Sequence, residues 1–153
     1  MIDALIKHLQ KSAKLNDSID VERFDATLSQ IASLHDPKAI GMLLPFLNDT
    51  SKFPEAMFSI IHTIERFDDE TYVQEILKGL PLFLQRSPYW ANVVHFRILN
   101  HPPAFNAYRS HLARADNLIK AAAINLFGKM REVYPKFVLQ CDEMLAVLGA
   151  GNR

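Results

Sequence analysis

The fold is decided by residues Asp36–Asn100, which read DPKAIGMLLPFLNDTSKFPEAMFSIIHTIERFDDETYVQEILKGLPLFLQRSPYWANVVHFRILN. This stretch contains the same kind of segment twice: a helix start, an apolar run with a proline, a polar turn and a second apolar helix. Ile60–His62 in the first copy is matched by Val93–His95 in the second, 33 residues later. Such a period is typical of stacked helix pairs. The stretch therefore predicts two helical hairpins in succession.

Prolines and capping residues mark the helix boundaries in both copies. Asp36–Pro37 places an acid before the exposed amides and a proline at the first helical position, where no intrahelical hydrogen bond is lost. Ser87–Pro88 repeats this arrangement. Pro45 and Pro81 lie near the ends of the first helices, and a proline in a regular helix interior costs about 3 kcal/mol. Burial of a leucine contributes roughly 1.5–3 kcal/mol, so we expect kinked helices to survive there.

Apolar residues recur at helical spacing along the rest of the chain, without an alternating strand pattern. The first helices of successive pairs begin near residues 36, 69, 102 and 134, again about 33 residues apart. The sequence therefore predicts an all-α fold of about eight to nine helices. The expected helices cover residues 2–14, 19–34, 36–47, 53–67, 69–84, 87–99, 102–115, 117–130 and 135–148.

The repeated hairpins also predict an architecture. Short turns make consecutive helices antiparallel neighbours, and each pair leaves an apolar face that only another pair covers. We expect a short, curved α-solenoid forming one domain over residues 1–153, with N-terminal helices in 1–35, helix-pair repeats in 36–148 and a frayed tail in 149–153. The Asp-Pro-x-Ala-Ile start and the following Leu-x-x-Leu-x-Asp spacing resemble a HEAT repeat, and the resemblance covers residues 36–131.

Composition narrows the class of protein. The chain has 153 residues, of which 49% are hydrophobic and 22% charged, as in ordinary globular domains. No apolar run approaches the roughly 18 residues that span a bilayer, and the N-terminus does not resemble a secretory signal. Cys141 is the single cysteine, so no intrachain disulfide forms. We expect a cytoplasmic protein that does not contact a membrane.

Charge is distributed unevenly along a chain whose formal net charge is zero. Residues 1–76 contain 13 acidic and 7 basic residues, a net charge of −6. Residues 77–153 contain 4 acidic and 10 basic residues, a net charge of +6. This asymmetry indicates a charged partner, whereas the zero total argues against general coating of nucleic acid.

A narrower resemblance rests on five segments in order: Asp36–Pro37, Glu55–Met57, Ile64–Glu65, Ser87–Ala91 and Arg97–Asn100. Together they resemble the immunity protein 30 family, which is associated with bacterial polymorphic-toxin and contact-dependent inhibition systems. The resemblance implies a small cytoplasmic protein that binds a cognate toxin domain and blocks it. It names neither the toxin nor the contact residues.

Two groups of residues in this stretch are candidates for partner contact. Tyr89 and Trp90 place two aromatic side chains in the first turn of a helix, which suits a binding hot spot; a tryptophan there equally suits the edge of the core. Arg97 and Asn100 share a helix face and, with Glu65, form either a buried polar cluster or a charged contact.

The densest acidic cluster supplies the remaining candidates, Glu65, Asp68, Asp69 and Glu70. One of the two aspartates serves as a helix cap, and an acid in the first turn interacts favourably with the helix dipole. The excess negative charge fits a basic toxin domain such as a nuclease, since complementary charge raises association rates. A solvated corner without a partner is the structural alternative.

Catalytic and metal sites are not predicted. His62 and Glu65 share a face, but a metal needs three or four convergent ligands, and the chain has neither a cysteine pair nor a His-Glu-x-x-His motif. Cys141 falls in an apolar stripe, and no nucleophile or nucleotide-binding motif is present. We therefore expect no enzyme activity, cofactor or small-molecule ligand.

Two other functions remain open. A line of basic residues along a concave face would follow a phosphate backbone, as in a helical-repeat protein that binds nucleic acid. The residues concerned are Arg86, Arg97, Arg109, Arg114, Lys120, Lys129 and Arg131. A general scaffold for protein assembly is the third possibility.

Overall fold

The computed structural model describes residues 1–149. Within these residues the chain forms nine α-helices and two short 3-10 helices, η1 and η2, and no strand. The all-α prediction is confirmed. The helices are α1 (Ile2–Ser12), α2 (Ser18–Ser33), α3 (Lys38–Leu43), η1 (Leu44–Phe46), α4 (Pro54–Ile64), α5 (Asp69–Arg86), α6 (Pro88–Leu99), α7 (Pro102–Ala113), α8 (Asn117–Val133), η2 (Pro135–Phe137) and α9 (Val138–Val147).

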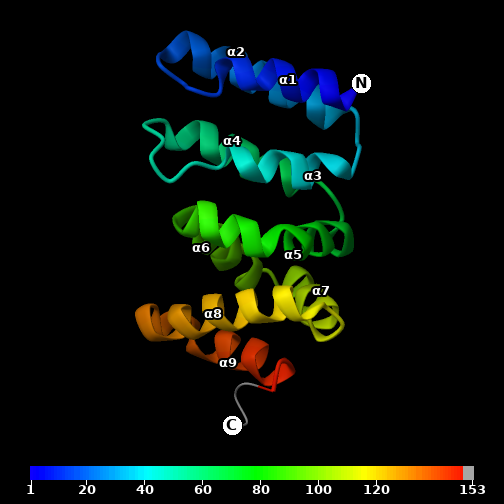
Figure 1. Ribbon diagram of the computed structural model, residues 1–153, viewed down its shortest axis with the longest axis vertical. Coiled ribbons are helices and arrows are strands. Elements are labelled where there is room, and N and C mark those ends of the chain that lie inside the picture. Colours follow the sequence, from blue (N-terminus) through cyan, green and yellow to red (C-terminus); the bar gives the residue numbers. More distant parts are fainter. Residues whose placement is uncertain (150–153) are drawn as a thin grey trace.

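The helices are stacked in chain order along the long axis of the molecule (Figure 1). α1 packs against α2, α3 against α4, and α5 against α6, while the first helices stack on one another from α1 through α3, α5 and α7 to α9. The N-terminal helix, whose docking the sequence left open, thus lies on α2 and α3. The next two helices depart from this plan, because α7 and α8 both pack against the long helix α5.

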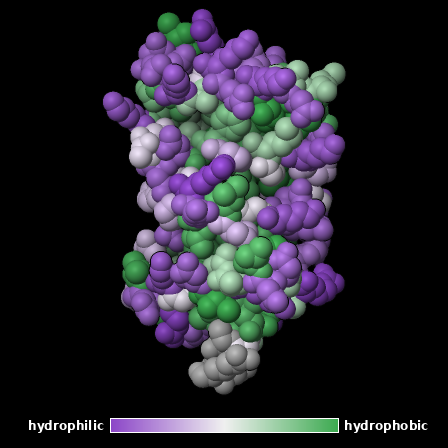
Figure 2. Space-filling view, in the orientation of Figure 1, coloured by the Kyte–Doolittle hydropathy of each residue, from purple (hydrophilic) through white to green (hydrophobic). Residues whose placement is uncertain are grey.

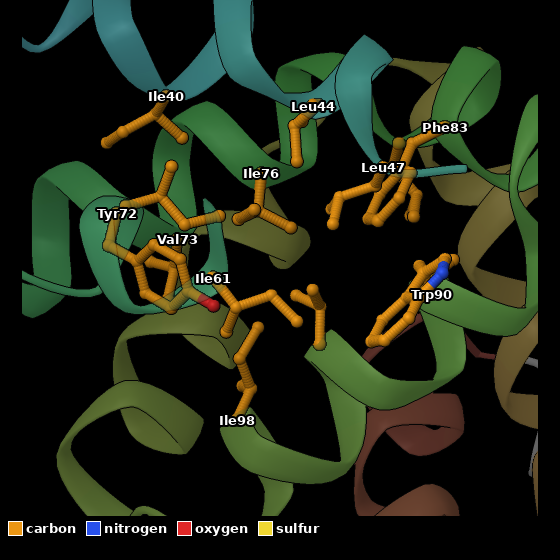
Figure 3. Close-up of a cluster of buried hydrophobic side chains, with 14 of the residues drawn as sticks. Ile40, Leu44, Leu47, Ile61, Tyr72, Val73, Ile76, Phe83, Trp90 and Ile98 are labelled. Atoms are coloured by element: carbon orange, nitrogen blue, oxygen red, sulfur yellow. The ribbon is translucent and has the colours of Figure 1, made fainter. Parts of the chain in front are cut away.

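A continuous hydrophobic core runs through the stack, from Leu9 in α1 to Met144 in α9. Figure 3 shows its central part, where side chains of α3, η1, α4, α5 and α6 meet. Cys141 is buried in α9, as its apolar stripe predicts. Each large apolar side chain in this core contributes roughly 1.5–3 kcal/mol by burial, so packing dominates the stability of the stack.

The two interior prolines have different outcomes. α5 continues through Pro81 as expected. At Pro45 the expectation of an α-helix to Leu47 is wrong: α3 ends at Leu43, and η1 carries the proline. The Leu47 amide donates to the Leu44 carbonyl three residues back at 3.1 Å. Because a proline has no amide to donate and its ring crowds the preceding turn, the tighter helix replaces the last turn of α3.

The Asp36 side chain accepts from the Lys38 amide at 3.0 Å, and Asp68 is the cap expected within the acidic cluster, whereas the cap expected at Ser87 is wrong. The side chains of Asp17, Asp68 and Asp116 each accept a hydrogen bond from the backbone amide three residues later, at 2.9, 2.9 and 3.0 Å. Ser87, in contrast, does not cap α6. Its hydroxyl donates to the Leu47 carbonyl instead.

The cap of α6 comes from the turn before α4. Asp49 accepts hydrogen bonds from the amides of Tyr89 and Trp90, at 3.0 and 3.2 Å. A residue of one repeat therefore completes a helix of the next. The predicted tail of residues 149–153 lies, except for Gly149, outside the described residues.

The surface is largely polar on the face seen in Figure 2, where hydrophobic residues form separate patches along the middle and hydrophilic residues cover both sides. Among residues 1–149, no helix is both long and apolar enough to cross a bilayer.

Candidate functional site

Four of the eight predicted contact residues meet in one pocket of about 440 Å³, where α4, α5, α6 and α7 come together. Glu65 follows the end of α4, and Asp69 begins α5. Arg97 lies in the last turn of α6, and Asn100 follows it. The other lining residues are Tyr72, Ile98, His101 and Ala104. The pocket thus joins the acidic corner to the end of α6.

The repeat places these residues opposite one another. Glu65 and Arg97 are 32 residues apart, close to the repeat period, so they occupy corresponding positions of successive hairpins. Asp69 and His101 have the same offset and lie 3.4 Å apart between Oδ1 and Nε2. Stacked hairpins bring equivalent positions together, so ion pairs at this period follow from the fold.

A bidentate ion pair forms one wall of the pocket. Arg97 donates from Nε to Glu65 Oε2 at 2.7 Å and from a terminal nitrogen to Oε1 at 2.8 Å. The hydrogen bond to Glu65 raises the pKa of Arg97. The Glu65 side chain is 25% exposed and that of Arg97 41%. The pair is therefore partly exposed to solvent, not a buried cluster, and it adds little to stability by itself.

Tyr72 supplies an unusual polar atom beneath this wall. The residue is only 4% exposed, and its hydroxyl oxygen is buried without a hydrogen-bond partner among the described residues. Burial, and next the charge of Glu65, raises the pKa of Tyr72 well above its ordinary value. In Figure 3 the hydroxyl points toward the side of the cluster where Ile98 lies. A neutral phenol therefore belongs to the pocket lining, with its hydroxyl buried and without a hydrogen-bond partner among the described residues.

Asp68 and Glu70 flank the pocket but do not line it. Asp68 caps α5 by accepting from the amide and hydroxyl of Thr71, and these hydrogen bonds lower its pKa. Glu70 accepts from His111 Nε2 in α7. Both acids thus have structural partners, while their charge still adds to the negative rim.

The aromatic candidates lie at the other end of α6, roughly 12 Å from Arg97 along a helix with a rise of 1.5 Å per residue. Trp90 is 4% exposed and donates from Nε1 to the Asn48 carbonyl at 3.0 Å. Its ring makes an edge-to-face contact with Phe58, with centroids 5.3 Å apart. Trp90 therefore seals the core edge. Tyr89 is 58% exposed and makes an edge-to-face contact with the Trp90 ring.

Two further titratable side chains, those of His95 and Cys141, lie in the core. His95 is buried: Nδ1 donates to the Ala91 carbonyl at 2.6 Å, and Nε2 accepts from the Tyr108 hydroxyl at 2.9 Å. Burial lowers the pKa of His95 to about 4 and raises that of Cys141 to about 11. Within residues 1–149, no three His, Cys, Asp or Glu side chains are grouped to hold a metal ion.

Tyr72 and His101 were missed by the sequence reasoning. Tyr72 lies within the wide apolar arc of α5, so nothing local distinguishes it from a core residue. His101 was identified only as part of a helix end. The offset of 32 residues from Asp69 is the one signal that pairs it with the pocket.

Comparison with known families gives one result. The family model described as immunity protein 30 matches residues 11–108, more than half of the chain. The matched range contains every residue that lines the pocket. Neither the curated proteins nor the solved structures give a significant match. On the family match, the chain belongs to the immunity protein 30 family.

Proposed function

We propose that this protein binds the toxin domain encoded next to it and neutralises the toxin by covering its active site or an adjacent surface. Membership of an immunity family implies a cognate toxin. The observation that carries the proposal is the polar pocket, because four residues predicted for partner contact line it together. In the proposed mode the protein acts in the cytoplasm by binding alone, without chemistry of its own.

The charge of the pocket region supports a basic partner surface. Glu65, Asp68, Asp69 and Glu70 lie within six residues, and Arg66 is the only base among them. Glu65, Asp69 and Glu70 have side chains at least 25% exposed where they contact Arg97, His101 and His111. Complementary charge would raise the association rate and favour the correct partner. A nuclease toxin, whose substrate is an anion, fits this requirement.

Co-expression tests the proposal. Cells that produce the toxin domain encoded immediately upstream should survive when this protein is present and die when it is absent. Purified protein should also bind that domain, with an affinity that falls as salt is added. Death of cells in the presence of well-expressed protein would contradict the proposal.

Nucleic-acid binding is less well supported than the sequence indicated. Of the seven basic residues considered, Arg97, Arg109 and Arg131 pair with carboxylates, at 2.7, 3.3 and 2.7 Å. Paired cations have less charge available for phosphate contacts. A gel-shift assay at low salt separates the two functions, since a steep salt dependence with DNA or RNA would favour nucleic acid.

A further inference from the structure

We propose that the pocket between Glu65 and Tyr72 receives one basic side chain, arginine or lysine, from the toxin. This inference rests on the proposed function and adds the chemistry of the central contact. Its basis is the combination of two carboxylates, a held ion pair and an unpartnered buried hydroxyl in a single pocket of about 440 Å³.

The carboxylates favour a cation. Glu65 and Asp69 face the pocket with Arg97 as the one permanently charged base, and Asp68 and Glu70 add negative charge nearby. Arg97 donates one hydrogen bond to each Glu65 oxygen. A carboxylate accepts about four hydrogen bonds in all, so Glu65 retains acceptor capacity. Arg97 also holds the carboxylate in a fixed orientation, which reduces the entropy lost when a second cation binds.

Tyr72 provides the feature that a solvated acidic corner would lack. Its hydroxyl is buried and unpartnered, and leaving such a group unsatisfied is unfavourable. A donor group that enters the pocket would give this oxygen its missing hydrogen bond once the side chains covering the oxygen move aside. The charges of Glu65, Arg97 and Asp69 all act on the Tyr72 hydroxyl, which agrees with its position beneath them.

The remaining lining fits the stem of a basic side chain. Ile98 and Ala104 are buried and apolar, and they line the pocket with the Tyr72 ring. Arginine and lysine bury their methylene groups against such surfaces while the charged end reaches polar atoms. An acidic or purely apolar side chain would satisfy only part of this lining.

Three pocket variants and one matched control test the inference against the toxin domain. Glu65→Gln and Asp69→Asn remove charge, and Tyr72→Phe removes only the hydroxyl. Glu22→Gln removes one acid from an exposed position on α2, a helix that does not line the pocket. We expect toxin binding to weaken roughly tenfold in each pocket variant and to remain unchanged in the control. Thermal unfolding verifies that each variant is folded.

A second measurement needs no toxin. N-acetyl-arginine amide and N-acetyl-lysine amide are titrated into the protein, with the neutral N-acetyl-citrulline amide as the control. The amide signals of Ile98, Asn100 and Ala104 should shift with the cationic probes and not with citrulline. Their relative strength distinguishes arginine from lysine, and Glu65→Gln should abolish the shifts.

The outcomes separate this inference from the proposed function. If the wild type neutralises the toxin and folded pocket variants neutralise it equally well, the inference is overturned and the function stands. Equal shifts with citrulline, or no shift at the pocket, also overturn the inference. If the cationic probes bind but the wild type fails to protect cells, the pocket stands and the proposed function falls.

Discussion

The two ends of α6 belong to the same junction between repeats, yet they are built in opposite ways. At its N-terminal end, Asp49 accepts from two helix amides, Ser87 donates to a carbonyl and Trp90 fills the core edge. At its C-terminal end, Arg97 holds the partly exposed Glu65 carboxylate near the Tyr72 hydroxyl, which has no partner among the described residues. At the N-terminal end, called the closed end below, the polar groups have hydrogen-bond partners. At the C-terminal end, called the open end, the Tyr72 hydroxyl has no partner among the described residues. Under the proposed function, the N-terminal end of α6 contributes to stability and the C-terminal end to recognition.

The largest effect is expected at the closed end. Trp90→Ala removes a buried ring and should destabilise the protein by about 3–5 kcal/mol, measured by urea unfolding. The variant should lose toxin binding only in proportion to unfolding. If it stays fully stable, Trp90 is not the seal that its 4% exposure indicates.

His95, in the middle of α6, should make the stability of the protein depend on pH. The pKa of His95 is lowered to about 4 in the folded state, below its ordinary value of 6.5, so the unfolded chain binds the proton more readily between these values. The contribution of neutral His95 to the free energy of unfolding is complete above pH 6.5. It falls by about 3 kcal/mol as the pH drops through 4.

Unfolding titrations at several pH values measure this contribution. His95→Gln removes the titrating group and should flatten that part of the profile relative to the wild type. Identical slopes in both proteins would show that His95 does not titrate in this way.

Loss of the shared cap should have a moderate effect. Asp49→Ala leaves the amides of Tyr89 and Trp90 without their acceptor and should cost about 1–2 kcal/mol. Asp49→Asn keeps an acceptor oxygen and serves as the control with a smaller loss. Calorimetric melting of both variants gives the comparison, and equal melting temperatures would contradict the role of this cap.

The smallest effect on stability is expected at the open end. Glu65→Gln should change the free energy of unfolding by less than about 1 kcal/mol, because the pair with Arg97 is partly solvated. The same variant should still lose toxin affinity, so its stability and its binding separate. A large loss of stability would make Glu65 a structural residue like those at the closed end.

The sequence predicted what is local and missed what depends on distant neighbours. Asp17, Asp68 and Asp116 cap the helices that follow them, and short-range rules are sufficient for such positions. Ser87 obeys the same rules but does not cap α6, because Asp49, some 40 residues earlier, already occupies the helix end. Which of these two side chains caps α6 depends on how the repeats stack.

The candidate site shows the same division. The sequence predicts a polar group of Arg97, Asn100 and Glu65, and the ion pair shows that Glu65 and Arg97 meet. Trp90 was considered both as a contact and as core, and its burial supports the second interpretation. Tyr72 was not predicted, because the lack of a partner for its hydroxyl depends on everything packed around it.

The hydrogen bonds that Asp49 accepts determine which fragments of the chain can form a complete α6. α6 begins with a proline, and the amides that follow it find their acceptor in a turn that lies before α4. An isolated second hairpin would therefore contain a frayed α6, whatever its own helix propensity. Cleavage near Phe67 would divide the chain between two repeats, and it would also separate the start of α6 from the residue that caps it. A fragment in which α6 is fully capped must then include the turn before α4, so the boundary of a repeat is not a boundary of autonomy.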